Sequence, residues 1–126
     1  MSVYLFTVPL VKGKTDTWKK YMKEITENRY EDYTKSRKRI GLKAEQVYLQ
    51  QTPQGDICVV KWDTDNPKRI FQEFAKSNDQ FDKWFRDKIL VECHGMDMNR
   101  EVPINMQYVD YRETPTREYA ETHKNR

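Results

Sequence analysis

The chain has 126 residues, of which 34 % are charged and 13 % are aromatic, and its formal net charge is +3. This length gives room for one domain, the mixed charges form no basic block for a nucleic acid, and no apolar run approaches the ~20 residues of a membrane span. Cys58 and Cys93 have neither the spacing of a metal site nor that of a disulfide framework, so we expect a cytoplasmic protein without a metal ion.

The N-terminal third predicts a strand followed by a long helix. Residues 3–8 are apolar in both alternation sets, which is typical of a central strand, and Pro9 ends it. A helix is expected from Thr15, as its N-cap, to Gly41, which stops it. Arg29 falls on the apolar stripe of this helix, so its side chain either lies along the core edge with its charge in water or faces a site. The stripe consists of Trp18, Tyr21, Met22, Ile25, Tyr33 and Ile40.

Residues 42–63, LKAEQVYLQQTPQGDICVVKWD, predict a β-hairpin around which the fold is organised. The arms are rich in β-branched and aromatic residues, and Pro53 and Gly55 lie in the turn between them. Both arms carry apolar residues in both alternation sets, so neither face should be left to water. We therefore expect helices on one face of the sheet and a second subunit on the other, which makes the protein a homodimer.

Two helices in tandem are predicted after the hairpin. Asn66 is a good N-cap, and Pro67 at the first helical position costs no hydrogen bond. The pattern from Ser77 to Gln80 fits a capping box that opens the second helix. Gly95 follows the apolar periodicity of that helix, where a left-handed C-cap belongs.

The order of elements predicts the fold class. Residues 103–111 alternate apolar and polar side chains, so they are expected to form a last strand. The protein should then be α+β, with a ferredoxin-like β-α-β-β-α-α-β order and a four-stranded antiparallel sheet that carries helices on one face. This domain spans residues 1–111, and residues 112–126 form a polar tail that adds little to the core of one subunit.

The hairpin, together with SNDQFDKWFRDKILVECHGMDM at residues 77–98, resembles the dimeric α+β barrel superfamily over residues 3–111. More closely, it resembles an uncharacterised group related in fold to antibiotic-biosynthesis monooxygenases and stress-responsive barrel proteins. The resemblance implies a homodimer whose sheets pack face to face, with a cleft between each sheet and its own helices. Members degrade haem, oxidise polyketides without a cofactor, isomerise lactones or have no known activity. His94 lies in a different segment from the axial histidine of the haem-degrading members, so no cofactor is expected.

Five residues are the candidates for a site that binds a small aromatic or polyketide-like molecule. His94 is the candidate general base, although a histidine at a helix end can also be a purely structural cation. Tyr48 and Trp62, from the two hairpin arms, combine an apolar body with one polar atom, or they are simply core residues. Arg29 and Trp84 complete the predicted wall between the sheet and the helices.

Two functional classes follow from these residues. The first is a small-molecule enzyme of the cofactor-free monooxygenase or isomerase type that acts in the sheet–helix cleft. The alternative is a non-catalytic dimeric module that binds a ligand or is associated with stress. An enclosed cavity of about 300 Å³ or more, reached by polar groups, would favour the first class. Arg86, four residues after Asp82, is expected either to pair with it on the surface or to stabilise an enolate-like oxygen.

Overall fold

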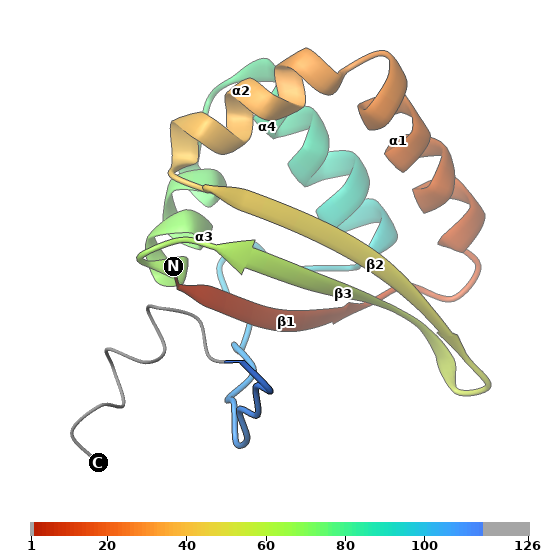
Figure 1. Ribbon diagram of the computed structural model, residues 1–126. Helices are drawn as coiled ribbons and strands as arrows, with labels where there is room; N and C mark the ends of the chain where they lie inside the picture. The colour runs from red at the N-terminus through yellow and green to blue at the C-terminus, as the bar shows by residue number, and fades with distance from the viewer. Residues whose placement is uncertain (1, 115–126) are drawn as a thin grey trace.

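The computed structural model describes residues 2–114 and has an α+β architecture, with the helices on one face of a curved sheet (Figure 1). The sheet has three antiparallel strands in the order β1-β3-β2. The elements in chain order are β1 (Val3–Pro9), α1 (Thr15–Glu27), α2 (Tyr30–Ile40), β2 (Ala44–Thr52), β3 (Gly55–Asp63), α3 (Pro67–Lys76), α4 (Gln80–Phe85) and η1 (Arg86–Cys93).

The predicted hairpin is present as β2 and β3. Thr52 pairs with Gly55 at the turn, and the ladder continues to the pair formed by Ala44 and Asp63. β1 pairs with the other edge of β3, so β3 is the central strand, while β1, which was expected to be central, lies at an edge. The sheet has one covered face and one open face, because the helices lie on a single side (Figure 1).

The covered face holds the core. Phe6 and Val8 of β1 and Cys58, Val60 and Trp62 of β3 point to this side and are buried. The helices cover these side chains with further buried apolar residues: Trp18, Ile25, Ile40, Ile70, Phe74, Phe81 and Ile89.

The open face also carries apolar side chains. Val3 and Leu5 of β1 and Tyr48 of β2 are exposed by 43 %, 41 % and 56 %. Lone exposed apolar residues are common, but these three lie on one face of a sheet that has no cover within the described chain.

Residues 103–111, predicted as the last strand, lie outside the sheet. Asn105 N–H donates to the carbonyl of Leu5 at 2.7 Å, so the segment meets the free edge of β1 at one point. Beyond that contact Met106, Tyr108 and Val109 are 75–85 % exposed. The sheet of the described residues therefore has three strands. Residues 103–111 touch the edge of β1, where a fourth strand was expected, but they do not pair along it.

The single helix predicted from Thr15 to Gly41 is two helices. The N–H groups of Asn28 and Arg29 both donate to the carbonyl of Glu24, which widens the last turn of α1. These two residues separate α1 from α2. Lys14 is the N-cap residue, while Thr15 donates its hydroxyl to Asp56 at 2.6 Å. No Gly or Pro stands at the break, and the apolar periodicity continues across it, so the sequence predicted one continuous helix.

The ends of the later helices follow the predicted chemistry in part. The side chain of Asn66 accepts from the N–H of Arg69, as predicted for the N-cap of α3, and Gly95 has the left-handed φ of +63°. The N-cap of α4 is Asp79, whose carboxylate accepts from Phe81 and Asp82, and not Ser77 as predicted. An aspartate in this place also favours the helix dipole.

Candidate functional site

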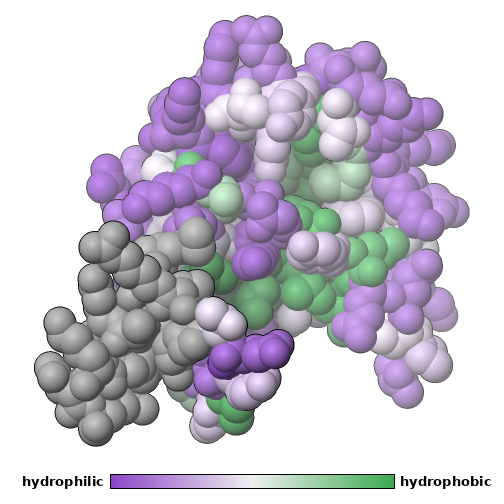
Figure 2. Space-filling view, viewed as in Figure 1, coloured by the Kyte–Doolittle hydropathy of each residue, from purple (hydrophilic) through white to green (hydrophobic). Residues whose placement is uncertain are grey.

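A cavity of about 340 Å³ lies between the covered face of the sheet and the helices. Its walls are mostly apolar and come from all three strands, from α1, α2 and α3, and from η1. It opens between the joint of α1 and α2 and the edge strand β2, where the lining residues Thr26, Tyr30 and Val47 are exposed. Figure 2 shows apolar surface around a hollow below these helices. A pocket of this size and lining suits a small organic molecule.

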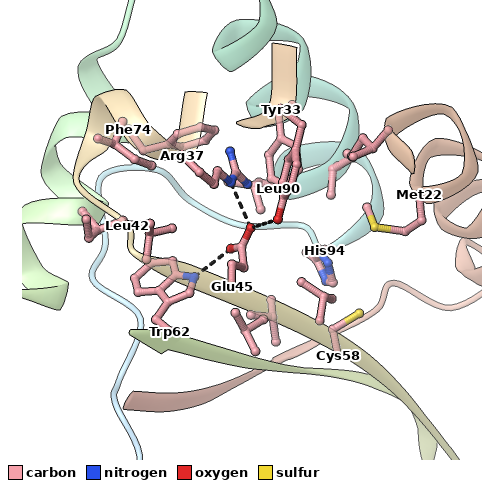
Figure 3. Close-up of a pocket in the computed structure, with 18 of the residues that line it drawn as sticks. Met22, Tyr33, Arg37, Leu42, Glu45, Cys58, Trp62, Phe74, Leu90 and His94 are labelled. Carbon is pink, nitrogen blue, oxygen red and sulfur yellow. Dashed lines mark hydrogen bonds and ion pairs between the residues drawn. The ribbon is translucent and has the colours of Figure 1, made fainter. Parts of the chain in front are cut away.

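One wall of the cavity carries a buried cluster of four polar side chains (Figure 3). Oε1 of Glu45 accepts from the hydroxyl of Tyr33 at 2.6 Å and from Nε of Arg37 at 2.9 Å. Oε2 of Glu45 accepts from Nε1 of Trp62 at 2.7 Å. The Glu45 and Arg37 side chains are only 7 % and 10 % exposed, so this is a desolvated ion pair held by neutral donors.

Local structure explains why these four residues meet. Glu45 of β2 lies directly opposite Trp62 of β3, so both side chains point to the same face of the sheet. Tyr33 and Arg37 are four residues apart on α2, which places them on one side of that helix. Sequence reasoning did not find Tyr33, Arg37 or Glu45. The i, i+4 spacing of Tyr33 and Arg37 was a usable signal, but the partner strand could not be assigned before the hairpin register was known.

The cluster has a defined charge state. Burial opposes ionisation of Glu45, but the charge of Arg37 and the hydrogen bonds from Tyr33, Arg37 and Trp62 outweigh it, and the pKa of Glu45 is lowered. Burial, with a contribution from the Glu45 charge, raises the pKa of Tyr33, while Arg37 opposes this rise. The guanidinium of Arg37 also packs against the ring of Phe85, 4.3 Å from its centroid. Glu45 is therefore an anion and Tyr33 a neutral hydrogen-bond donor at neutral pH.

His94 reaches the cavity from the end of η1, and its ring is drawn among the lining side chains in Figure 3. Its Nδ1 lies 2.9 Å from the carbonyl oxygen of Pro9. Because a carbonyl oxygen can only accept, Nδ1 carries the proton, and Nε2 of the neutral ring is left as an acceptor. Burial lowers the pKa of His94, although the bond to Pro9 acts in the other direction. The neutral imidazole is the form suited to take a proton from a bound molecule.

The π-helical geometry of η1 determines where His94 lies. The N–H of His94 donates to the carbonyl of Ile89, five residues earlier. In an α-helix, Phe85 and His94 would be separated by about two and a half turns and would lie on opposite sides. The wider π turn reduces this to about two turns, so Phe85, Ile89 and His94 all line the cavity. π-Helical turns of this kind are often found at functional sites.

Of the five residues predicted from the sequence, Trp62 and His94 line the cavity. Tyr48 does not, because it lies opposite Val59, whereas Trp62 lies opposite Glu45. Positions an odd number of residues apart on a strand point to opposite faces, so Tyr48 belongs to the open face of the sheet. The prediction that Tyr48 and Trp62 border one cleft is thereby corrected.

Arg29 and Trp84 form a separate contact outside the cavity lining. The guanidinium carbon of Arg29 lies 4.2 Å from the centroid of the Trp84 ring, and its Nε donates to Glu24 at 3.0 Å. Trp84 also packs on Tyr21 and Phe81. Arg29 lies between α1 and α2, outside both helices, and Trp84 lies on α4 next to Phe85, which does line the cavity.

Asp82 and Arg86 do not pair with each other. Asp82 is fully buried and accepts hydrogen bonds from Ser36, Ser77 and Arg39, which joins α2 to the start of α4. Arg86 donates instead to three carbonyl groups at the end of α3, those of Phe74, Ala75 and Ser77. The predicted surface pair is therefore wrong, and neither side chain lines the cavity.

Within residues 2–114, no group of three or more His, Cys, Asp or Glu side chains is arranged to hold a metal ion, and no helix is both long and apolar enough to cross a membrane. The described residues that line the cavity thus offer a ligand an apolar wall, the neutral imidazole of His94 and the ion pair of Arg37 and Glu45. Comparisons with protein-family models, curated proteins and solved structures give no match to this chain.

Proposed function

We propose that the cavity binds a small, largely apolar molecule and that His94 acts on it as a general base. This is chemistry of the cofactor-free isomerase or monooxygenase type. The observation that carries the proposal is the position of His94, with Nδ1 anchored on Pro9 and the ring among the residues that line an apolar cavity of about 340 Å³.

Proton transfer is the reaction type that these groups support best. A general base must be present in its proton-accepting form at the working pH. The lowered pKa of His94 meets that condition. Arg37, held in the cavity wall by Glu45, supplies a fixed positive charge near which negative charge can develop.

A thermal-shift screen with aromatic and polyketide-like compounds, haem included, tests the binding step, because a ligand of the native state raises its apparent stability. Solvent-deuterium incorporation into each bound compound, followed by NMR, tests the proton transfer. The matched variant is His94→Asn, whose amide can still donate to Pro9 but which has no Nε2 base. Exchange in the wild type that is lost in His94→Asn, with binding retained, supports the proposal.

The alternative function is a non-catalytic ligand-binding module in which the same cavity only holds a molecule. The three hydrogen bonds that hold Glu45 would suit such a role equally, since they fix the polar part of the wall. Binding without deuterium exchange in the wild type would favour this alternative, and the failure of every compound to bind would exclude both functions of the cavity.

We propose further that the protein is a homodimer of the dimeric α+β barrel type. The open face of the sheet, with Val3, Leu5 and Tyr48 exposed, provides the surface that a second copy would cover. Residues 103–111, which meet β1 through Asn105, would then complete a four-stranded sheet within the assembly. Light scattering at micromolar concentration should give the mass of two chains, and a compact monomer would refute the proposal.

A further inference from the structure

Two of the five N–H groups of Arg37 donate hydrogen bonds of standard geometry to the described residues, and neither belongs to Nη2. A guanidinium group presents Nε and Nη2 along one edge, and a carboxylate usually takes both with its two oxygens. Here Glu45 accepts from Nε with Oε1 alone, while Nη1 of Arg37 donates to Ser36 at 3.1 Å on the other side. Nη2 makes no hydrogen bond of standard geometry to the residues that the structure describes, although the guanidinium group also acts on the nearby hydroxyl of Tyr33.

Trp62 is the reason that the pair is not bidentate. Its Nε1 binds Oε2 of Glu45 at 2.7 Å and so draws that oxygen away from the second position of the guanidinium edge. The unused position lies beside Glu45 on a side chain that lines the cavity, next to the apolar walls (Figure 3). Among the described residues, only Oδ1 of Asp63 is a fully buried side-chain polar atom without a hydrogen-bond partner. Nη2 therefore retains some accessible surface.

We infer that Nη2 of Arg37 binds the carbonyl oxygen of an uncharged, apolar ligand in the cavity. This assignment rests on the proposed function of the cavity and specifies the class of ligand. A donor on a buried cation forms a strong hydrogen bond with a neutral oxygen. A carboxylate or phosphate ligand is disfavoured, because Glu45 already neutralises Arg37 and would repel a second anion in the same desolvated wall.

The assignment also fits the proton transfer proposed for His94. Nε2 of His94 takes a proton from the carbon next to the carbonyl group, the C–H electron pair becomes the new C=C bond, and the C=O π pair moves to oxygen. The resulting enolate oxygen bears the negative charge, which the Nη2–H group stabilises together with the positive charge that His94 gains with the proton. Unlike a bound carboxylate, the enolate therefore adds no net charge to the cavity. Return of the same proton to another carbon of the conjugated system completes an isomerisation, so no oxidant or reductant is consumed.

Three probes of similar shape test the inference by calorimetric titration: 2-acetylnaphthalene, 2-ethylnaphthalene and 2-naphthoate. The ketone should bind about tenfold more tightly than the hydrocarbon, as one hydrogen bond to a charged donor predicts. The carboxylate should bind most weakly. Binding of none of the three would contradict the proposed function of the cavity, whereas equal binding of ketone and hydrocarbon would overturn only the role of Arg37.

Trp62→Phe is the decisive variant. A phenylalanine cannot donate to Oε2 of Glu45, so this oxygen is free to turn to Nη2 and close the bidentate pair. The altered wall affects the hydrocarbon and the ketone alike, so the readout is the ratio of their affinities, which should fall from about ten to about one. The control is Phe71→Leu, which removes a ring that also lines the cavity and packs 4.7 Å from Trp62, without changing any hydrogen bond of Glu45.

The carbonyl stretching frequency of bound 2-acetylnaphthalene gives a second readout that needs no change at Trp62. In the wild type and in Phe71→Leu it should lie below its value in a hydrocarbon solvent, because the hydrogen bond weakens the C=O bond. An unshifted frequency in the wild type would overturn the inference even if Trp62→Phe failed to fold. A preference for the ketone that survived in folded Trp62→Phe would overturn it as well.

Discussion

A buried carboxylate is stable only where other groups replace the water that it has lost, and Glu45 illustrates this with two donors on Oε1 and one on Oε2. Glu45→Gln would remove the charge that neutralises Arg37 and leave a buried cation without a counter-ion. We expect the free energy of unfolding to fall by about 3 kcal/mol. Urea denaturation measures this change.

The control for this substitution is Glu31→Gln in the first turn of α2. Glu31 pairs with Lys35 at 3.1 Å, but these side chains are 83 % and 66 % exposed. Such a pair contributes little, so the change should be below about 0.5 kcal/mol. Equal losses for Glu45→Gln and Glu31→Gln would show that the buried cluster does not stabilise the fold as described.

The pH dependence of stability should have two parts. Burial lowers the pKa of His94 in the folded protein, so the unfolded chain binds the proton more readily, and stability falls as the pH drops below about 6.5. Glu45 and Asp82 have lowered pKa values because their donors outweigh burial, so their contribution is present above about pH 4 and is lost below it.

Urea midpoints measured from pH 8 to pH 3 separate these two parts. Wild-type protein should lose stability between pH 7 and pH 5, and again below about pH 4. His94→Asn should abolish most of the first decline and retain the second. A first decline of the same size in His94→Asn would mean that another group is responsible for it.

At the scale of the elements, substitution of two glycines that have positive φ separates the cost of backbone strain from the cost of packing. Gly95 has φ +63°, and an added Cβ would meet Cγ2 of Val11 at 3.2 Å, whereas Gly13 has φ +84° and would meet nothing within 4 Å. Gly13→Ala should cost about 1 kcal/mol for the left-handed backbone alone. Gly95→Ala should cost more, because Val11 must also move, and thermal unfolding would rank the two variants. The reverse ranking would contradict the close contact at the end of η1.

Sequence patterns predicted the elements with local chemical signals and missed those that depend on neighbouring elements. The hairpin turn, the N-cap at Asn66 and the left-handed Gly95 all have such signals, and all three are present. The break after α1 and the π turns of η1 have none, because no Gly or Pro stands at either place. Tyr48 was assigned to the wrong face of the sheet because the pairing register of the hairpin was unknown. A register error of one residue moves every side chain of a strand to the opposite face.

The candidate site was predicted in the same uneven way. Trp62 and His94 were found because each combines an unusual residue type with a recognisable position, near the end of a strand and at the end of a helix. Arg37 and Glu45 look like ordinary charged residues of a polar chain in the sequence. Only the strand register and the rotation of α2 bring them together, and neither can be obtained from a single sequence.

On the scale of the whole molecule, the sheet has a functional side and an unpartnered side. The helices, the cavity and the cluster around Glu45 lie on one face, while the other face exposes Val3, Leu5 and Tyr48. Residues 103–111 run from the edge between the two, where Asn105 meets Leu5. An apolar extended segment next to a free strand edge is a common means by which one chain pairs with another.

Two truncations distinguish this segment from the tail. Residues 112–126, of which 115–126 lie outside the described part of the chain, can be removed with little effect on the melting temperature, because we expect them to add little to the core. Removal of residues 105–126 keeps Val102 and Ile104, which pack against the core, but deletes the exposed apolar segment. Sedimentation should then show a dimer for the first variant and a folded monomer for the second. If the first deletion already dissociated the dimer or sharply lowered the melting temperature, the tail would reach the partner subunit, whereas a stable dimer in the second would place the interface on the open face of the sheet alone.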